Sequence, residues 1–399
     1  MKATLVAFCH KFIRSKIMYR QLKNMFELSR LKDDLHEIYF NQVIETFAIS
    51  LVSIFIPIYL LDNGFSVLES FTFMLVYWGA MFLFTPIAAE ISSKIGFKHT
   101  IIYRAPLLIV FFSTLLFIEY LSSIILFIAL LGGFSSILYW VSTNAEFVKN
   151  TSDSSQSKQI GYLNALPQIS ATVAPLISAF ILTVLGFPML FVIVISLVII
   201  SQIPFLLTGD YKEKFSVRKG EWLFLDKRFS LLFLIQGVIF SNEFLTWNVF
   251  IFQKFGLISM GLSATLFGAG MAVFTFFVGN VSSNSRRRRN ILIIGALGYT
   301  LTCIVRISTT TPLEAILISL LAGIFTTLVS LPIYSEFCGR AKKDRVINWV
   351  TFRDVWLASG RVTFVLLAST ALLLDVQNFF SIAFFAAGMF SLLLLFLVK

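Results

Sequence analysis

The sequence predicts an all-α membrane protein in which twelve transmembrane helices form two pseudo-symmetric six-helix bundles. Three observations lead to this fold class. Twelve apolar stretches run along the 399 residues, lysine and arginine gather in every second gap between them, and two short motifs recur 190 residues further along the chain. The stretches indicate the class, the basic residues indicate the orientation, and the recurring motifs indicate the two halves.

Each apolar stretch is close to the ~20 residues that a helix needs to cross the hydrocarbon core of a bilayer. The stretches lie at 38–61, 70–90, 100–118, 124–145, 160–185, 187–208, 229–251, 258–279, 290–308, 313–335, 346–373 and 377–398. The chain is 57% hydrophobic and 13% charged, and in a water-soluble protein of this size much of that apolar surface would face water. Genome base composition can raise the phenylalanine count to 45, but it does not explain the regular gaps.

Basic residues give the orientation. They concentrate before the first stretch, in the gaps after stretches 2, 4, 6, 8 and 10, and at Lys399, whereas the gaps after odd-numbered stretches hold only Lys254 and Arg306. Basic loops stay on the cytoplasmic side, so we expect a multi-pass protein of the cytoplasmic (inner) membrane with both termini inside the cell. The net charge of +11 then reflects orientation and attraction to anionic lipid headgroups, not nucleic-acid binding.

The stretches divide the chain into four parts. Residues 1–35 form a basic cytoplasmic tail, either an amphipathic helix along the inner membrane face or a frayed end. Residues 36–208 hold the first six stretches, 209–228 form a cytoplasmic linker, and 229–399 hold the other six. The three cysteines lack the spacing of a disulfide or metal site, and we expect neither a metal nor a cofactor.

Two motifs recur in one register. Residues 89–99 after stretch 2 and 279–289 after stretch 8 each contain a Ser-Ser pair, and the pairs are 190 residues apart. Residues 145–148 and 335–338, at the ends of stretches 4 and 10, each contain Glu-Phe at the same distance. Repeated halves are typical of secondary transporters.

With these motifs the chain resembles the major facilitator superfamily. That family carries a pattern of the form G-x-x-x-D-R/K-x-G-R/K-R/K in the cytoplasmic loop between helices 2 and 3. The positions that fit are Lys94, Gly96 and Lys98, and the departures are Ala89, Ser93 and Phe97. Ser93 replaces the acid that links the loop to the neighbouring bundle. Over residues 36–399 the resemblance implies helices 1, 4, 7 and 10 around a central cavity, and the apolar interiors of stretches 3, 6, 9 and 12 independently favour lipid exposure for these four.

A second element of the resemblance lies in stretch 5. Ala174 and Pro175 begin a worn version of the G-P-x-x-G-G element found in antiporter branches of the family. Proline bends a helix and small neighbours permit close packing. This element favours export of an amphipathic compound, with import of a nutrient or metabolite as the alternative.

Four charged residues inside the stretches are candidates for substrate or proton binding. Glu45, Glu243, Arg361 and Asp354 would be costly in hydrocarbon and should face a cavity or a partner. A carboxylate in a cavity can carry a coupling proton, and an arginine can hold an anionic substrate through its planar fork. The alternatives are that the glutamates are structural ion-pair partners, for example of Arg361, and that Arg361 pairs with Asp354 or a glutamate.

Two larger sets complete the candidate site. A cavity lined by aromatic rings with a few polar groups suits an amphipathic molecule, although each such residue can equally serve helix packing. The cavity-lining candidates are Asn41, Gln236, Trp247, Tyr139, Trp140, Asn144, Thr326, Thr327, Ser330 and Tyr334. The cytoplasmic gate candidates are Ser93, Lys94, Gly96, Lys98, Glu146, Arg286, Arg287 and Glu336, with basic loops closing on the two glutamates.

The expected function is secondary transport. The chain contains no G-x-x-x-x-G-K-[ST] loop for ATP, and its three histidines lie in the tail or near the cytoplasmic surface, which disfavours metal or acyl-transfer chemistry. We therefore expect a monomeric, non-enzymatic, proton- or ion-coupled transporter of a small molecule in the lipid bilayer. A non-transporting sensor or assembly protein is the rival, because the acid expected at Ser93 is missing.

Overall fold

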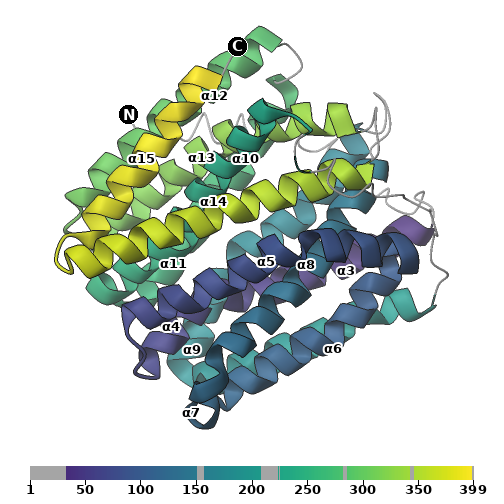
Figure 1. Cartoon of the computed structure of the whole chain (residues 1–399), viewed down its shortest axis with the longest axis horizontal. Coiled ribbons are helices and arrows are strands. Elements are labelled where there is room, and N and C mark those ends of the chain that lie inside the picture. Colours follow the sequence, from purple (N-terminus) through teal and green to yellow (C-terminus); the bar gives the residue numbers. More distant parts are fainter. Residues whose placement is uncertain are drawn as a thin grey trace, which may run out of the picture.

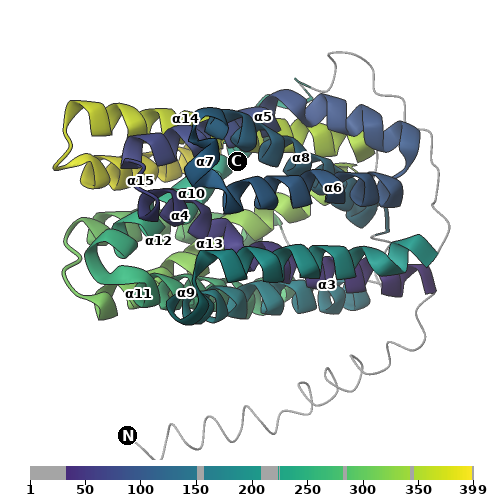
Figure 2. The ribbon, with the colours of Figure 1, turned by 90° about the horizontal axis from the view of Figure 1, so that it is seen from below.

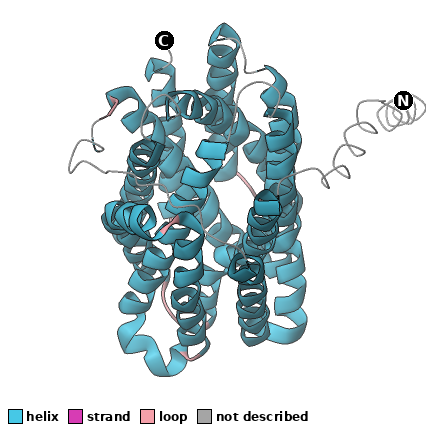
Figure 3. Ribbon diagram, turned by 90° about the vertical axis from the view of Figure 1, so that its right-hand side faces the viewer, coloured by secondary structure: helices cyan, strands magenta, loops and turns pink. Residues whose placement is uncertain are grey.

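The computed structural model is helical throughout the part of the chain that it describes, namely residues 33–150, 157–207, 223, 225–281, 285–341 and 346–397. No strand occurs within these residues, and short loops join the helices (Figure 3). The expected tail at 1–35 and linker at 209–228 fall almost wholly outside the described residues.

The first half of the chain contains the following helices. In order they are α3 (Asp33–Val52), the 3-10 turn η2 (Ser53–Phe55), α4 (Ile56–Asp62), α5 (Val67–Ile95), α6 (Phe97–Leu116), α7 (Ile118–Leu121), the 3-10 turn η3 (Ser122–Ile124), α8 (Ile125–Asn150) and α9 (Ser157–Leu207). Gly96 joins α5 to α6 with a φ of 110°, a conformation that residues with a Cβ rarely adopt. Glycine at this position thus permits the sharp turn between α5 and α6.

The second half repeats the pattern of long helices. It contains α10 (Lys227–Ser241), the π-helical turn η5 (Asn242–Thr246), α11 (Trp247–Val281), α12 (Ser285–Ile307), α13 (Pro312–Ala341), α14 (Val346–Leu374) and α15 (Phe379–Leu397). Between α14 and α15, Asp375 accepts hydrogen bonds from the Asn378 side chain at 2.8 Å and from two backbone N–H groups. These bonds lower the pKa of the Asp375 carboxyl.

Ten helical segments among the described residues are long and apolar enough to cross a membrane. The two longest, Pro167–Ile203 and Lys227–Thr275, each contain one residue with a non-helical backbone. Gly186 (φ 76°, ψ 178°) interrupts α9, and Gly256 (φ 81°, ψ −179°) interrupts α11. Both glycines lie where the sequence predicts the gap between neighbouring stretches.

Packing is densest between helices of the same half. In the first half α3 packs on α9, and α8 packs on α5 and α6; in the second, α13 packs on α11 and α12, and α14 packs on α10 (Figure 1). Contacts between the halves run from α14 to α5 and α8, and from α9 to α11, which lie side by side in Figure 2. The interface between α14 and α5 is therefore formed by segments that are far apart in the sequence.

The contact between α9 and α11 depends on small residues. A Cβ placed on Gly261 would lie 2.5 Å from the Ala179 Cβ and 3.0 Å from the Pro175 carbonyl oxygen. Gly268 approaches Thr172 in the same way, at 3.1 Å. The stretch around Pro175 thus forms part of the surface that the second half contacts.

Candidate functional site

A buried ion pair connects the first and third long helices of the first half. Glu45 on α3 accepts a hydrogen bond from Arg104 on α6, and their side chains are only 0% and 2% exposed. Glu45 also accepts from the Ser201 hydroxyl at 2.7 Å and the Gln202 amide at 3.1 Å, both on α9. The Tyr139 ring covers the Arg104 guanidinium at 4.4 Å, so the charge is enclosed on several sides.

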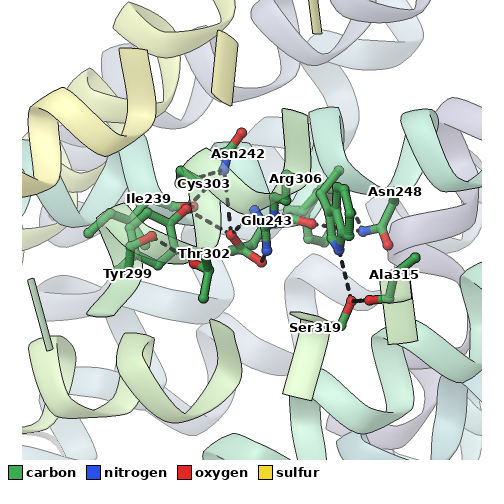
Figure 4. Close-up of polar contacts among 12 residues, drawn as sticks. Ile239, Asn242, Glu243, Asn248, Tyr299, Thr302, Cys303, Arg306, Ala315 and Ser319 are labelled. Atoms are coloured by element: carbon green, nitrogen blue, oxygen red, sulfur yellow. Dashed lines mark hydrogen bonds and ion pairs between the residues drawn. The ribbon is translucent and has the colours of Figure 1, made fainter. Parts of the chain in front are cut away.

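A second buried pair connects the corresponding helices of the second half (Figure 4). Arg306 on α12 donates to both carboxylate oxygens of Glu243, at 2.5 and 2.7 Å, and the Tyr299 hydroxyl donates to the same carboxylate at 2.7 Å. The Trp247 ring lies 4.3 Å from the Arg306 guanidinium, and the Trp247 indole N–H donates to Ser319 at 2.8 Å. A bidentate pair of this kind fixes both the distance and the orientation of the two helices.

Glu243 reaches Arg306 from a π-helical turn, which spans Asn242–Thr246. Single π turns inside α-helices occur frequently at functional sites. Next to Glu243, the Asn242 amide donates to the Tyr299 hydroxyl at 3.0 Å, and Asn248 donates back to the Glu243 carbonyl at 3.0 Å.

Removing one partner of a buried ion pair leaves an uncompensated charge and costs about 3–5 kcal/mol. Separating either pair would therefore be costly, so each pair holds together the helices that it joins. They join equivalent helices of the two halves at different positions, because the 190-residue register aligns Glu45 with Ile235 and not with Glu243.

The arginines of both pairs were missed by the sequence reasoning. Arg306 was counted with the loop charges and Arg104 was not among the candidates, but both are fully buried. The expectation of apolar interiors in stretches 3, 6 and 9 is wrong at Arg104, at Ser201 and Gln202, and at Arg306. The position of Arg104 inside the apolar stretch 100–118 was the signal that could have identified it.

Arg361 and Asp354 on α14 do not form the ion pair that was one alternative. Asp354 instead pairs with Arg353 at 3.0 Å and lies 3.5 Å from the Asn144 amide of α8, in the other half. The Arg361 guanidinium lies over the Phe240 ring at 4.2 Å, with one nitrogen 3.7 Å from the Met81 sulfur of α5. Arg361 thus reaches the boundary between the halves.

The other cavity-lining candidates make the following local contacts, and their common role in a cavity stays a prediction. Asn41 donates to the carbonyl of Ser201, the residue whose hydroxyl binds Glu45, at 2.8 Å, and Tyr139 covers Arg104. Gln236 lies 3.5 Å from the Ser330 carbonyl. The other contacts are those of Thr327 with the Gly323 carbonyl at 3.0 Å, Tyr334 with the Arg353 guanidinium at 5.2 Å, and Trp140 with the Tyr139 ring at 5.5 Å. Thr326 has a buried hydroxyl without a hydrogen-bond partner in the structure.

Three of the cytoplasmic gate candidates, Ser93, Lys94 and Glu336, have described contacts close to them in the same half or in the adjoining linker. Lys94 pairs with Glu90 of its own helix at 2.5 Å, and the Ser93 hydroxyl donates to the Glu90 carbonyl. Glu336 pairs with Arg228 at 3.1 Å and with Arg340 at 3.3 Å. Glu146 and Lys98 are at least partly buried, and the side chains of Arg286 and Arg287 lie outside the described residues. Closure of the loops on Glu146 and Glu336 stays a prediction.

Comparison with known proteins assigns the family. The family model of the Major Facilitator Superfamily matches residues 38–252, and a search of curated proteins finds no match. Two solved structures share the fold. The human organic anion transporter MFSD10 (TETRAN) has a TM-score of 0.69 at 13% identity over 93% of this chain and 100% of that one. The transporter FucP in the outward conformation has a TM-score of 0.67 at 10% identity over 92% and 97%. Since the family model spans more than half of the sequence, the chain belongs to the major facilitator superfamily of membrane transporters.

Proposed function

We propose that the protein is a secondary active transporter that carries a small solute across the cytoplasmic membrane by alternating access. In this proposal the chain crosses the membrane twelve times, because Gly186 and Gly256 each divide a long helical segment into two crossings. Residues 36–208 and 229–399 form the two moving halves, with both termini in the cytoplasm. The solute binds where α5, α10 and α14 meet.

The observation that carries the proposal is the contrast between contacts within and between the halves. Each buried glutamate–arginine pair joins helices of one half. The contacts described above across the boundary are of another kind: Trp78 meets Phe240 and Phe244, Gly261 meets Pro175, and the neutral Asn144 amide lies 3.5 Å from Asp354. Apolar and backbone contacts can be exchanged at little cost, whereas separating a buried ion pair is costly. The two halves are therefore suited to move as rigid bodies.

We further propose that a proton is the coupling ion and that Asp354 carries it. Neutralising Glu45 or Glu243 would leave Arg104 or Arg306 charged and without a counter-charge, with side chains 2% and 0% exposed. Neutralising Asp354 would leave Arg353, which is 18% exposed, so the cost is smaller. In addition, the Asn144 contact brings Asp354 to the other half. Glu45 and Glu243 are the alternative proton sites.

The direction that we favour is export of an amphipathic compound, since the Pro175 segment contacts Gly261 of the opposite half, as expected of an element that controls exchange. Import of a nutrient or metabolite through the same fold is the alternative. A non-transporting sensor or assembly role would instead show ligand binding without flux.

The test is transport by the purified protein in vesicles. Compounds that raise its thermal stability are assayed for flux with and without an imposed pH gradient. Wild type should accumulate the solute when the gradient is present. Asp354→Asn should lose this response but keep counterflow exchange, and Glu45→Gln and Glu243→Gln should keep both. If bound compounds never move, the sensor role is favoured; if Asp354→Asn behaves as wild type, the proton site is elsewhere.

A further inference from the structure

Among the described residues, Arg361 differs from Arg104, Arg306 and Arg353 in having no carboxylate at ion-pair distance. Arg104 and Arg306 each hold a glutamate, and Arg353 holds Asp354. For Arg361, no carboxylate of the described residues lies within 4.0 Å. Its guanidinium contacts the ring of Phe240 and the sulfur of Met81, and its Nε is buried without a hydrogen-bond partner among the described residues.

An unpaired guanidinium within a transmembrane helix is costly, by about 2.5–3.5 kcal/mol on the insertion scale. Arg361 lies in the middle of α14, which spans Val346–Leu374, so its side chain is far from either end of the helix. The nearby acid, Asp354, is two turns away along α14 and is already paired with Arg353. The presence of a charged Arg361 at this position is explained if an anionic ligand from outside the protein pairs with its guanidinium.

The groups around Arg361 also indicate what that anion is attached to. Phe240, whose ring lies under the guanidinium, is 40% exposed, whereas Trp78 beside it is only 2% exposed. Phe240 lies 5.3 Å from the Phe244 ring, and Trp78 contacts both rings at 6.4 and 6.0 Å. The guanidinium of Arg361 therefore lies next to an aromatic surface on which the ring of Phe240 is exposed.

We infer that Arg361 is the anion-binding residue of the transport site and that the substrate class is organic anions in which one carboxylate is attached to an apolar, preferably aromatic, body. This inference rests on the proposed transport function. The planar guanidinium offers two parallel donors to a carboxylate, and the body of the molecule stacks on Phe240 and its aromatic neighbours. The contact of Arg361 with Met81 at 3.7 Å places the site at the boundary between the halves, so binding is coupled to their movement.

Binding to the full-length protein tests the inference. The probes are benzoate, 1-naphthoate and 4-phenylbutyrate, each compared with its neutral amide by thermal stabilisation and calorimetry in zwitterionic detergent. At least one acid should bind wild type while its amide does not. Arg361→Gln should weaken binding of that acid by about tenfold to a hundredfold, as expected for loss of a hydrogen bond to a charged group. Arg361→Lys should retain part of the affinity, because it keeps the charge without the fork.

Arg340→Gln is the control variant. Arg340 pairs with Asp226 and Glu336 near the cytoplasmic end of α13, so this change should leave the affinity as in wild type. Equal binding by wild type and Arg361→Gln, or binding of none of the three acids, would overturn the inference. So would loss of acid binding when phosphatidylglycerol replaces phosphatidylcholine in vesicles, because a lipid headgroup would then be the anion that Arg361 holds.

Failure of this inference can be distinguished from failure of the proposed function. If a neutral or cationic compound is transported and Arg361→Gln transports it normally, the proposed transport function is supported and the assignment of Arg361 to anion binding is wrong. If the acids bind through Arg361 but no solute crosses the membrane, the anion site is supported and the proposed transport function is wrong.

Discussion

At the residue scale, Arg104, Arg306 and Arg353 each have a carboxylate at ion-pair distance, whereas for Arg361 the described residues provide none. A paired arginine contributes to stability chiefly by preventing an isolated buried charge. An unpaired one reduces stability and is therefore a candidate for ligand binding. Single substitutions of the paired arginines should therefore lower stability, whereas substitution of Arg361 should affect ligand binding.

Substitutions of Glu243 and Arg306 should have non-additive effects on stability. Glu243→Gln leaves Arg306 charged and without its counter-charge, so we expect a loss of about 3–5 kcal/mol of stability. The double variant Glu243→Gln with Arg306→Met should recover much of that loss, since both charges are gone. Thermal unfolding of the purified variants measures the coupling. Additive effects would mean that the 2.5 Å contact is not an energetically coupled pair.

Arg361 and Arg104 should respond in opposite ways to the same substitution. In ligand-free protein, Arg361→Met removes an unpaired charge and should raise the unfolding temperature, by an amount equivalent to at most about 3 kcal/mol. Arg104→Met removes the partner of Glu45 and should lower the unfolding temperature. Thermal scans at one pH and in one detergent compare the two directly. A marked decrease with Arg361→Met would show that Arg361 has a structural partner.

At the element scale, local irregularities place the important groups. The π turn Asn242–Thr246 carries Glu243 toward Arg306, and Gly186 and Gly256 interrupt two long helices. The sequence predicted both interruptions, because each falls in a short gap between apolar stretches. It did not predict the π turn, since one extra residue in a turn leaves no mark on an apolar stretch.

The contact between α9 and α11 should be sensitive to a single methyl group. Gly261→Ala places a Cβ 2.5 Å from the Ala179 Cβ and 3.0 Å from the Pro175 carbonyl oxygen, which forces the helices apart. We expect slower flux, with ligand binding retained, because the change affects the moving surface and not Arg361. Gly79→Ala is the matched control, since nothing lies within 4 Å of its added Cβ. Similar flux in both variants would exclude a special role for this contact.

At the scale of the whole molecule, the sequence was sufficient for the helical membrane class and for the family. Length and polarity of each stretch are local properties, and the repeat register is visible in the letters alone. The pairing of charges was not predictable in the same way. Glu45 and Arg104 are 59 residues apart, and only the packing of α3 against its neighbours brings them together. Glu45 was therefore found as a candidate, whereas its partner was not.

The orientation and the number of crossings remain predictions that labelling can test. Single cysteines are placed at Asn63, between α4 and α5, and at Ser216 in the linker, after Cys9, Cys303 and Cys338 have been replaced. Basic loops stay in the cytoplasm, so a membrane-impermeant maleimide should label position 63 from outside intact cells and position 216 only after permeabilisation. A cysteine at Gly186 should label from outside, because that glycine divides the fifth and sixth crossings. Labelling of positions 63 and 216 from the same side would contradict the twelve-crossing arrangement, and protection of position 186 on both sides would show that α9 does not turn at the outer surface.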